Sequence, residues 1–196
     1  MTDAITPKQR WDAALQAAVT AGHGESFSDV VFDFGLDIMT RQVFPGEDFQ
    51  VILAILRDRR LHGLKGAWNL MAVFNYEFEK LTQEQQDLLL QTLEDVHASY
   101  TDWHVPFFIA ELIGQRYPTR QGLDALIRMR RTKNQIARAF VPHGLQNLVR
   151  FARDPALKHE ATDQILAMRG DMSDQVRAEV EKAMAQLIDR GVIGRA

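Results

Sequence analysis

The chain has 196 residues, of which 46% are hydrophobic and 25% are charged, and it carries a formal net charge of −3. These values are ordinary for a globular protein and exclude wholesale disorder, and no apolar run reaches the roughly eighteen residues of a membrane-spanning helix. The absence of cysteine excludes disulfides and thiolate-bound metal. The first residues lack the basic start and apolar stretch of a signal peptide, so we expect a cytoplasmic protein with no membrane partner.

The N-terminal part of the chain is expected to form two helices. Thr6 is a suitable N-cap for a helix whose first residue is Pro7, and apolar residues then recur at helical spacing up to residue 22. A second apolar stripe over 26–38 predicts another helix. We assign residues 1–44 to these helices and expect them to cap one end of the fold.

The middle of the chain repeats the same pattern with short connections. Helical periodicity predicts helices near 48–56, 61–72, 82–96 and 101–112. Thr82 and Gln85 have the spacing of a capping box, in which each side chain bonds the other residue's backbone N–H.

The C-terminal part resumes after the break at residues 117–119. Further helix starts are expected near residues 119, 134, 144, 155 and 173. Asp154 and Pro155 again combine a cap with a proline at the first helical position, and Gly191 is the expected stop of the last helix. About eleven helices and no strands result.

This order of elements predicts one all-α domain over 1–196. The helices are expected to stack as consecutive antiparallel pairs, with helix-pair repeats over 48–170 and a C-terminal capping helix over 173–190. The alternative is an irregular helical bundle, which produces the same amphipathic stripes.

One segment carries a family resemblance. Residues 148–161 read LVRFARDPALKHEA, in which an apolar helix ends in a turn with Asp and Pro before a second helix begins. The segment resembles a HEAT repeat, and looser copies extend the resemblance over about residues 48–190. It implies an α-solenoid that presents a long face to a macromolecule.

Charge is distributed unevenly along the chain. Residues 77–111 hold eight acidic side chains and one lysine, whereas residues 116–153 hold nine basic side chains and one aspartate. Opposite charges on adjacent segments can attract each other, pair two copies of the chain, or serve partners.

The best candidate site is a basic cluster near the expected end of a helix. We define it by its five side chains, Arg128, Arg130, Arg131, Lys133 and Arg138. Favourable charge at a helix C-terminus explains one or two of them, but four basic residues within six positions exceed that need. Such a cluster suits an acidic protein surface or nucleic-acid phosphates.

No motif indicates catalysis, a metal or another cofactor. The six histidines never share the i, i+3 or i, i+4 spacing of helical metal ligands, and we expect them at the surface or at helix ends. Phosphate-binding loops and nucleophile elbows are also missing. Among the aromatic residues of 68–78 we expect mainly core packing, with any exposed ring a contact point for a partner.

The leading hypothesis is therefore a non-catalytic protein-binding module, such as an adaptor or an immunity-type inhibitor, with an acidic partner on the basic cluster. The alternative is a nucleic-acid-binding helical-repeat protein. The basic segment and residues 100–104 faintly resemble HEAT-like DNA glycosylases for alkylated purines, although no acidic residue follows Trp103 at short spacing.

Overall fold

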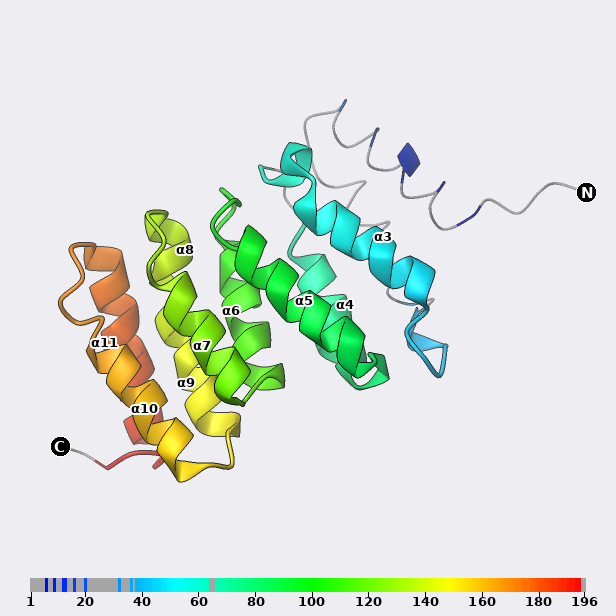
Figure 1. The fold of residues 1–196 in the computed structure, drawn as a ribbon. Helices are drawn as coiled ribbons and strands as arrows, with labels where there is room; N and C mark the ends of the chain where they lie inside the picture. The colour runs from blue at the N-terminus through cyan, green and yellow to red at the C-terminus, as the bar shows by residue number, and fades with distance from the viewer. Residues whose placement is uncertain are drawn as a thin grey trace, which may run out of the picture. The chain divides into compact units, whose positions relative to one another are not determined.

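In a computed structural model, residues 38–63 and 66–194 are described, together with eight isolated earlier positions: Thr6, Gln9, Asp12, Ala13, Gln16, Thr20, Phe32 and Leu36. This part of the chain is helical and contains no strand, which confirms the all-α prediction (Figure 1). None of its helices is both long and apolar enough to cross a bilayer. Contacts divide the chain into two compact units, residues 1–92 (unit 1) and 93–196 (unit 2).

Unit 1 contains α3 (Gly46–Arg57), the short 3₁₀ helix η1 (Arg59–Leu61), α4 (Asn69–Glu77), η2 (Phe78–Lys80) and most of α5 (Gln83–Val96). Its core is centred on three rings from α3, α4 and the turn before α3. The centroids of Phe44, Phe49 and Phe74 lie 5.7 to 6.0 Å apart, in one stacked and two edge-on pairs. Such ring geometry adds specific attraction to the burial of large apolar area.

Local signals for helix starts were read correctly in this unit. Thr82 and Gln85 form the predicted capping box, with reciprocal backbone to side-chain bonds of 2.9 and 3.2 Å. Thr6 and Gln9 form a similar pair at 2.9 and 3.3 Å. The predicted helices over 6–22 and 26–38, including Trp11 and Leu15, otherwise lie mainly outside the described residues.

The helix predicted over 61–72 is wrong in its first half. The backbone turns after η1, and α4 begins only at Asn69. Gly66 adopts a positive φ of 97°, a left-handed conformation that a right-handed helix does not contain and that favours glycine. Apolar spacing alone did not reveal this interruption.

Unit 2 contains α6 (His104–Arg116), α7 (Arg120–Met129), α8 (Gln135–Ala139), α9 (Val141–Phe151), α10 (Pro155–Leu166) and α11 (Asp174–Asp189). The central element is α9, which contacts α6, α7, α8, α10 and α11 (Figure 1). As predicted, Asp154 caps α10 by accepting a bond from the Ala156 backbone, and Pro155 is its first residue. Gly191, with a φ of 67°, follows α11.

Two glycines set the distance between α6 and α9. A Cβ added to Gly114 would lie 2.1 Å from the carbonyl oxygen of Gly144, and a Cβ on Gly144 would lie 2.7 Å from that of Ala110. Real Cβ atoms do not approach backbone this closely. The two helices therefore pack backbone against backbone, which only these small residues allow.

We expect the substitution Gly114→Ala to destabilise the protein by about 3 kcal/mol, because α6 and α9 must separate in a closely packed core. Denaturant unfolding followed by circular dichroism measures the change. The matched control is Gly170→Ala, since no atom lies within 4 Å of a Cβ at that position. Equal unfolding midpoints for the two variants would contradict the assigned role of the close contact.

Candidate functional site

The basic cluster lies at the end of α7 and in the turn that follows, as predicted. α7 ends at Met129, and Arg130 is its C-cap residue. Asn134 then caps α8 by accepting bonds from the backbones of Ile136 and Ala137. Arg138 projects from α8 itself, so the cluster spans two helices.

Three of the five basic side chains bind other parts of unit 2. Arg128 forms a two-bond ion pair with Glu94 at the end of α5, and Arg130 donates to Gln164 of α10. Arg138 reaches Asp171 at 2.8 and 3.1 Å and the Thr132 carbonyl oxygen at 2.6 Å. Because the Arg138 side chain is only 14% exposed, its charge holds the loop before α11 and is poorly placed for a partner.

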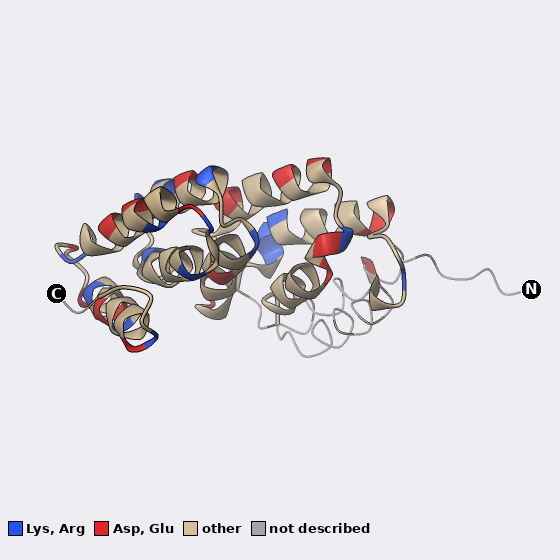
Figure 2. Cartoon of the chain, turned by 90° about the horizontal axis from the view of Figure 1, so that it is seen from below, with Lys and Arg blue, Asp and Glu red and all other residues tan. Residues whose placement is uncertain are grey.

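The remaining two cations of the basic cluster lie at the surface. Arg131 and Lys133 are exposed, and their side chains make no hydrogen bond or ion pair within the described residues. In Figure 2 acidic and basic residues alternate along the helices toward the C-terminus rather than gathering by sign. The basic cluster is thus mainly an internal bridge between helices, with two cations left at the surface.

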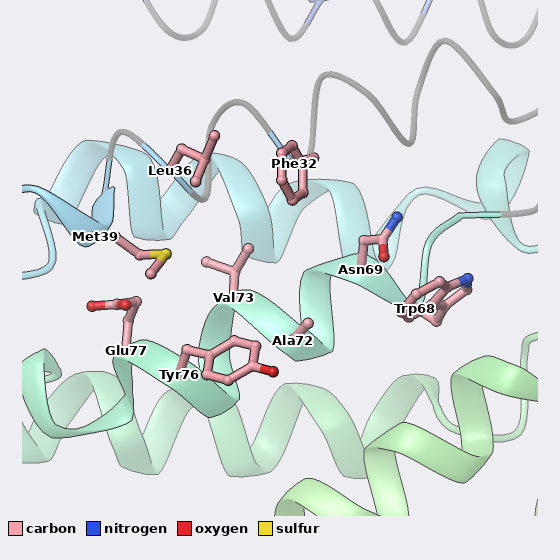
Figure 3. A pocket seen from close by; sticks show the side chains of 9 residues that line it. All are labelled: Phe32, Leu36, Met39, Trp68, Asn69, Ala72, Val73, Tyr76 and Glu77. Atoms are coloured by element: carbon pink, nitrogen blue, oxygen red, sulfur yellow. The ribbon is translucent and has the colours of Figure 1, made fainter.

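A second candidate site is an apolar pocket in unit 1. A pocket of about 330 Å³ is lined by nine side chains: Phe32, Leu36, Met39, Trp68, Asn69, Ala72, Val73, Tyr76 and Glu77. Figure 3 shows the first three on one side and the α4 side chains on the other. We call this feature the apolar groove. Its volume is within the range of binding sites for ligands or anchor side chains.

The groove exists because α4 is apolar on two faces. Leu70, Met71 and Phe74 are buried in the core of unit 1. The opposite face carries Ala72 and Tyr76 into the groove. A helix with one face in solvent normally carries polar residues there, so apolar residues on both faces indicate a second surface to be covered.

Exposure of the groove's side chains is unusually high for apolar residues. Tyr76 is 75% exposed, Phe32 65% and Met39 53%. Isolated exposed apolar residues are common, but exposed apolar residues gathered around one pocket make it a candidate interaction site. Core packing was predicted for Tyr76, and that prediction is wrong, whereas Phe74 and Phe78 are buried as predicted.

An ion pair between a buried carboxylate and a half-buried lysine lies at one end of the groove. The Glu77 carboxylate is buried and contacts the Lys80 ammonium at 2.5 Å. The same ammonium donates to the carbonyl oxygens of Ile38 and Met39 at 3.2 and 3.1 Å. Lys80 therefore ties the chain at Met39 to the end of α4.

We expect Lys80→Met to destabilise unit 1 by about 1–3 kcal/mol, because Glu77 and two carbonyl groups lose their partner. Methyl NMR of labelled methionine should also show Met39 moving toward the signal of the fully exposed Met172, which is 97% exposed. The control is Lys158→Met, whose ammonium makes no ion pair within the described chain. An unchanged Met39 signal would contradict the role of Lys80.

A second group of interacting side chains lies on α6, α9 and α11 of unit 2. Phe107 stacks on the His143 ring at 4.5 Å between centroids, and Asn147 lies 3.2 Å from the His143 Nε2 atom. Arg150 donates to the Asn147 side-chain oxygen at 3.2 Å. Across α9, Gln146 donates to Gln186 of α11 at 2.7 Å. These contacts satisfy the buried amides, so the group is a closed network between helices.

Burial changes the acid–base behaviour of this network. It lowers the pKa of His143 to about 4, with Lys182 and Arg150 adding unfavourable positive charge. Burial also raises the pKa of the Glu111 carboxyl, which Gln115 and Arg150 partly oppose. His143 is consequently neutral near pH 7, which its bond with Asn147 accommodates.

The burial of two histidines was not predicted from the sequence. His62 and His97 follow helix ends, as predicted, but both are buried rather than at the surface. The His97 ring lies 2.8 Å from the Glu94 carbonyl oxygen and 3.4 Å from that of Met129, and burial lowers its pKa. The largest pKa shift among the described histidines belongs to His143, which follows Pro142 on α9. Its spacing of four residues from Asn147 is the sequence signal that could have indicated the contact between the two side chains.

The free energy of unfolding should fall as the pH drops from about 6.5 toward about 4, because the unfolded chain protonates His143 in this interval while the folded chain resists it. His143→Phe should make this part of the pH profile shallower and retain the ring packing. His159→Phe is the control, since the His159 side chain is 82% exposed. Denaturation series between pH 4 and 7 measure the slope, and identical slopes in the wild type and His143→Phe would refute the assignment.

Within the described residues no three His, Asp or Glu side chains are grouped so that they could hold a metal. No protein-family model matches the chain, and neither curated proteins nor solved structures yield a match.

Proposed function

We propose that the chain is a non-catalytic protein-binding module that holds its partner at the apolar groove of unit 1. The single observation that carries the proposal is the gathering of Phe32, Met39 and Tyr76, all more than half exposed, around one pocket. Large apolar and aromatic side chains at the centre of an interface supply most of its binding energy. An adaptor or an immunity-type inhibitor needs such a surface and no catalytic group.

The basic cluster supports this function less directly. Arg128, Arg130 and Arg138 already bind within unit 2. Arg131 and Lys133 remain as exposed cations for an acidic partner surface or for nucleic-acid phosphates. Two cations supply little of the phosphate contact that tight nucleic-acid binding requires, so the protein-binding proposal takes precedence over the nucleic-acid alternative.

We propose further that the helices of unit 2 stack as HEAT-like pairs. In support, α9 contacts both α6 and α11, and α7 contacts α10, so helices two or three places apart along the chain are neighbours. An ion pair also joins α7 and α10, since Arg120 of α7 reaches Glu160 of α10 at 2.7 Å. Stability would then be dominated by contacts between adjacent pairs.

Photo-crosslinking tests the protein-binding proposal. A photoreactive phenylalanine analogue in place of Tyr76 should give a discrete protein adduct in the organism of origin, and the same analogue in place of Met172 should not. The adduct should disappear when Met39→Lys is added, because a charge in the wall opposes apolar insertion. An adduct pattern that is the same from both positions would count against the proposal.

A further inference from the structure

We infer that the groove receives the apolar face of a short helix whose flanks are basic. This inference rests on the proposed function and names the chemistry of the partner. Three features support this choice of partner: the shape of α4, the charge of the groove walls, and the repulsion expected between two copies of the chain.

The α4 wall has a notch of one small residue between two large ones. Trp68, Ala72 and Tyr76 follow each other at intervals of four residues, so they lie on one side of the helix. Together they extend over about 12 Å, or a little more than two helical turns. Figure 3 shows Ala72 between the two rings. An inserted side chain would meet the Ala72 methyl group below and aromatic rings on both sides.

This geometry matches one face of a partner helix. Helices that bind in grooves present anchor side chains at i, i+4 and i+7, and the first and last of these are about 10 Å apart. That distance fits the length of the α4 wall. The facing wall of Phe32, Leu36 and Met39 is apolar as well, so the anchors are enclosed from two sides.

The walls come from two strongly acidic stretches of sequence. Among the described residues, the stretches 38–48 and 68–92, which supply Met39 and the α4 wall, contain six acidic residues and two basic ones, Arg41 and Lys80. Both basic residues are engaged inside unit 1, Arg41 with Asp48 at 3.4 Å and Lys80 with Glu77 at 2.5 Å. A partner with lysine or arginine beside its apolar anchors would complement this charge, which increases the association rate and specificity.

Charge also argues against a second copy of the chain as the occupant. A symmetric dimer pairs the same patch with itself. The two acidic stretches of one protomer would then face those of the other, which is unfavourable without intervening cations. A small apolar molecule, in turn, would leave the acidic flanks without a role.

The test uses three labelled synthetic peptides of about three helical turns. The first has leucines at i, i+4 and i+7, lysine at a few flanking positions and alanine elsewhere so that a helix can form, the second replaces lysine by glutamate, and the third scrambles the first. Fluorescence anisotropy at moderate salt measures their binding to the full chain. We expect the lysine helix to bind about tenfold or more tightly than either of the others.

Two variants locate the binding. Ala72→Phe fills the notch and should weaken binding of the lysine helix about tenfold, although it adds apolar surface. Tyr76→Ser should weaken it similarly by removing one ring. The matched control is Ala178→Phe, which places the same ring at an exposed position on α11 of unit 2 and should leave binding unchanged. Circular dichroism confirms that each variant is folded.

Each remaining outcome decides between the inference and the proposed function. Equal binding of the glutamate or the scrambled peptide overturns the basic helix as occupant, as does tighter binding to Ala72→Phe. No peptide binding, with a Tyr76 crosslink to a protein still present, overturns the helix and leaves the protein-binding function standing. A dimer in sedimentation that Tyr76→Ser dissociates overturns the inference in favour of a second copy.

Discussion

The contact between α6 and α9 at Gly114 and Gly144 is the constraint on which unit 2 depends. Because neither residue has a side chain, the two backbones approach closely enough for the apolar residues on both sides to interdigitate. The close approach of α6 and α9 also places Phe107 against His143 and leaves Asn147 buried. The low pKa of His143 is thus a consequence of backbone packing more than of any neighbouring charge.

In unit 2, several ion pairs join elements that are distant in the sequence. The adjacent acidic and basic segments of the sequence meet at Glu94 and Arg128, and further pairs connect Arg120 with Glu160 and Arg138 with Asp171. Exposed pairs of this kind contribute little stability each, but a two-bond arginine pair fixes the register of neighbouring helices. A linear count of charge therefore overstates the field that a partner of unit 2 would experience.

Sequence reasoning succeeded where a signal is local. The capping pair Thr82–Gln85 and the start of α10 at Asp154–Pro155 depend on residues a few positions apart, and both were predicted. It could not assign partners across helices, because the bond from Arg138 to Asp171 joins residues 33 positions apart. For the same reason the groove was missed. Tyr76 has the residue type and spacing of a core ring, and only the arrangement of α4 against its neighbours leaves it exposed.

The groove and the core of unit 1 are two consequences of one helix. The contacting rings of Phe44, Phe49 and Phe74 bury one face of α4 and so stabilise unit 1. The groove face of α4 is exposed and adds less of this stability. Lys80 then holds the chain at Met39 through two backbone carbonyl groups, so the position of Met39 does not require that the groove be filled. A surface held open in this way loses little conformational entropy when a partner binds. The apolar residues of α4 that the core of unit 1 leaves exposed are consequently those that the proposed partner would contact.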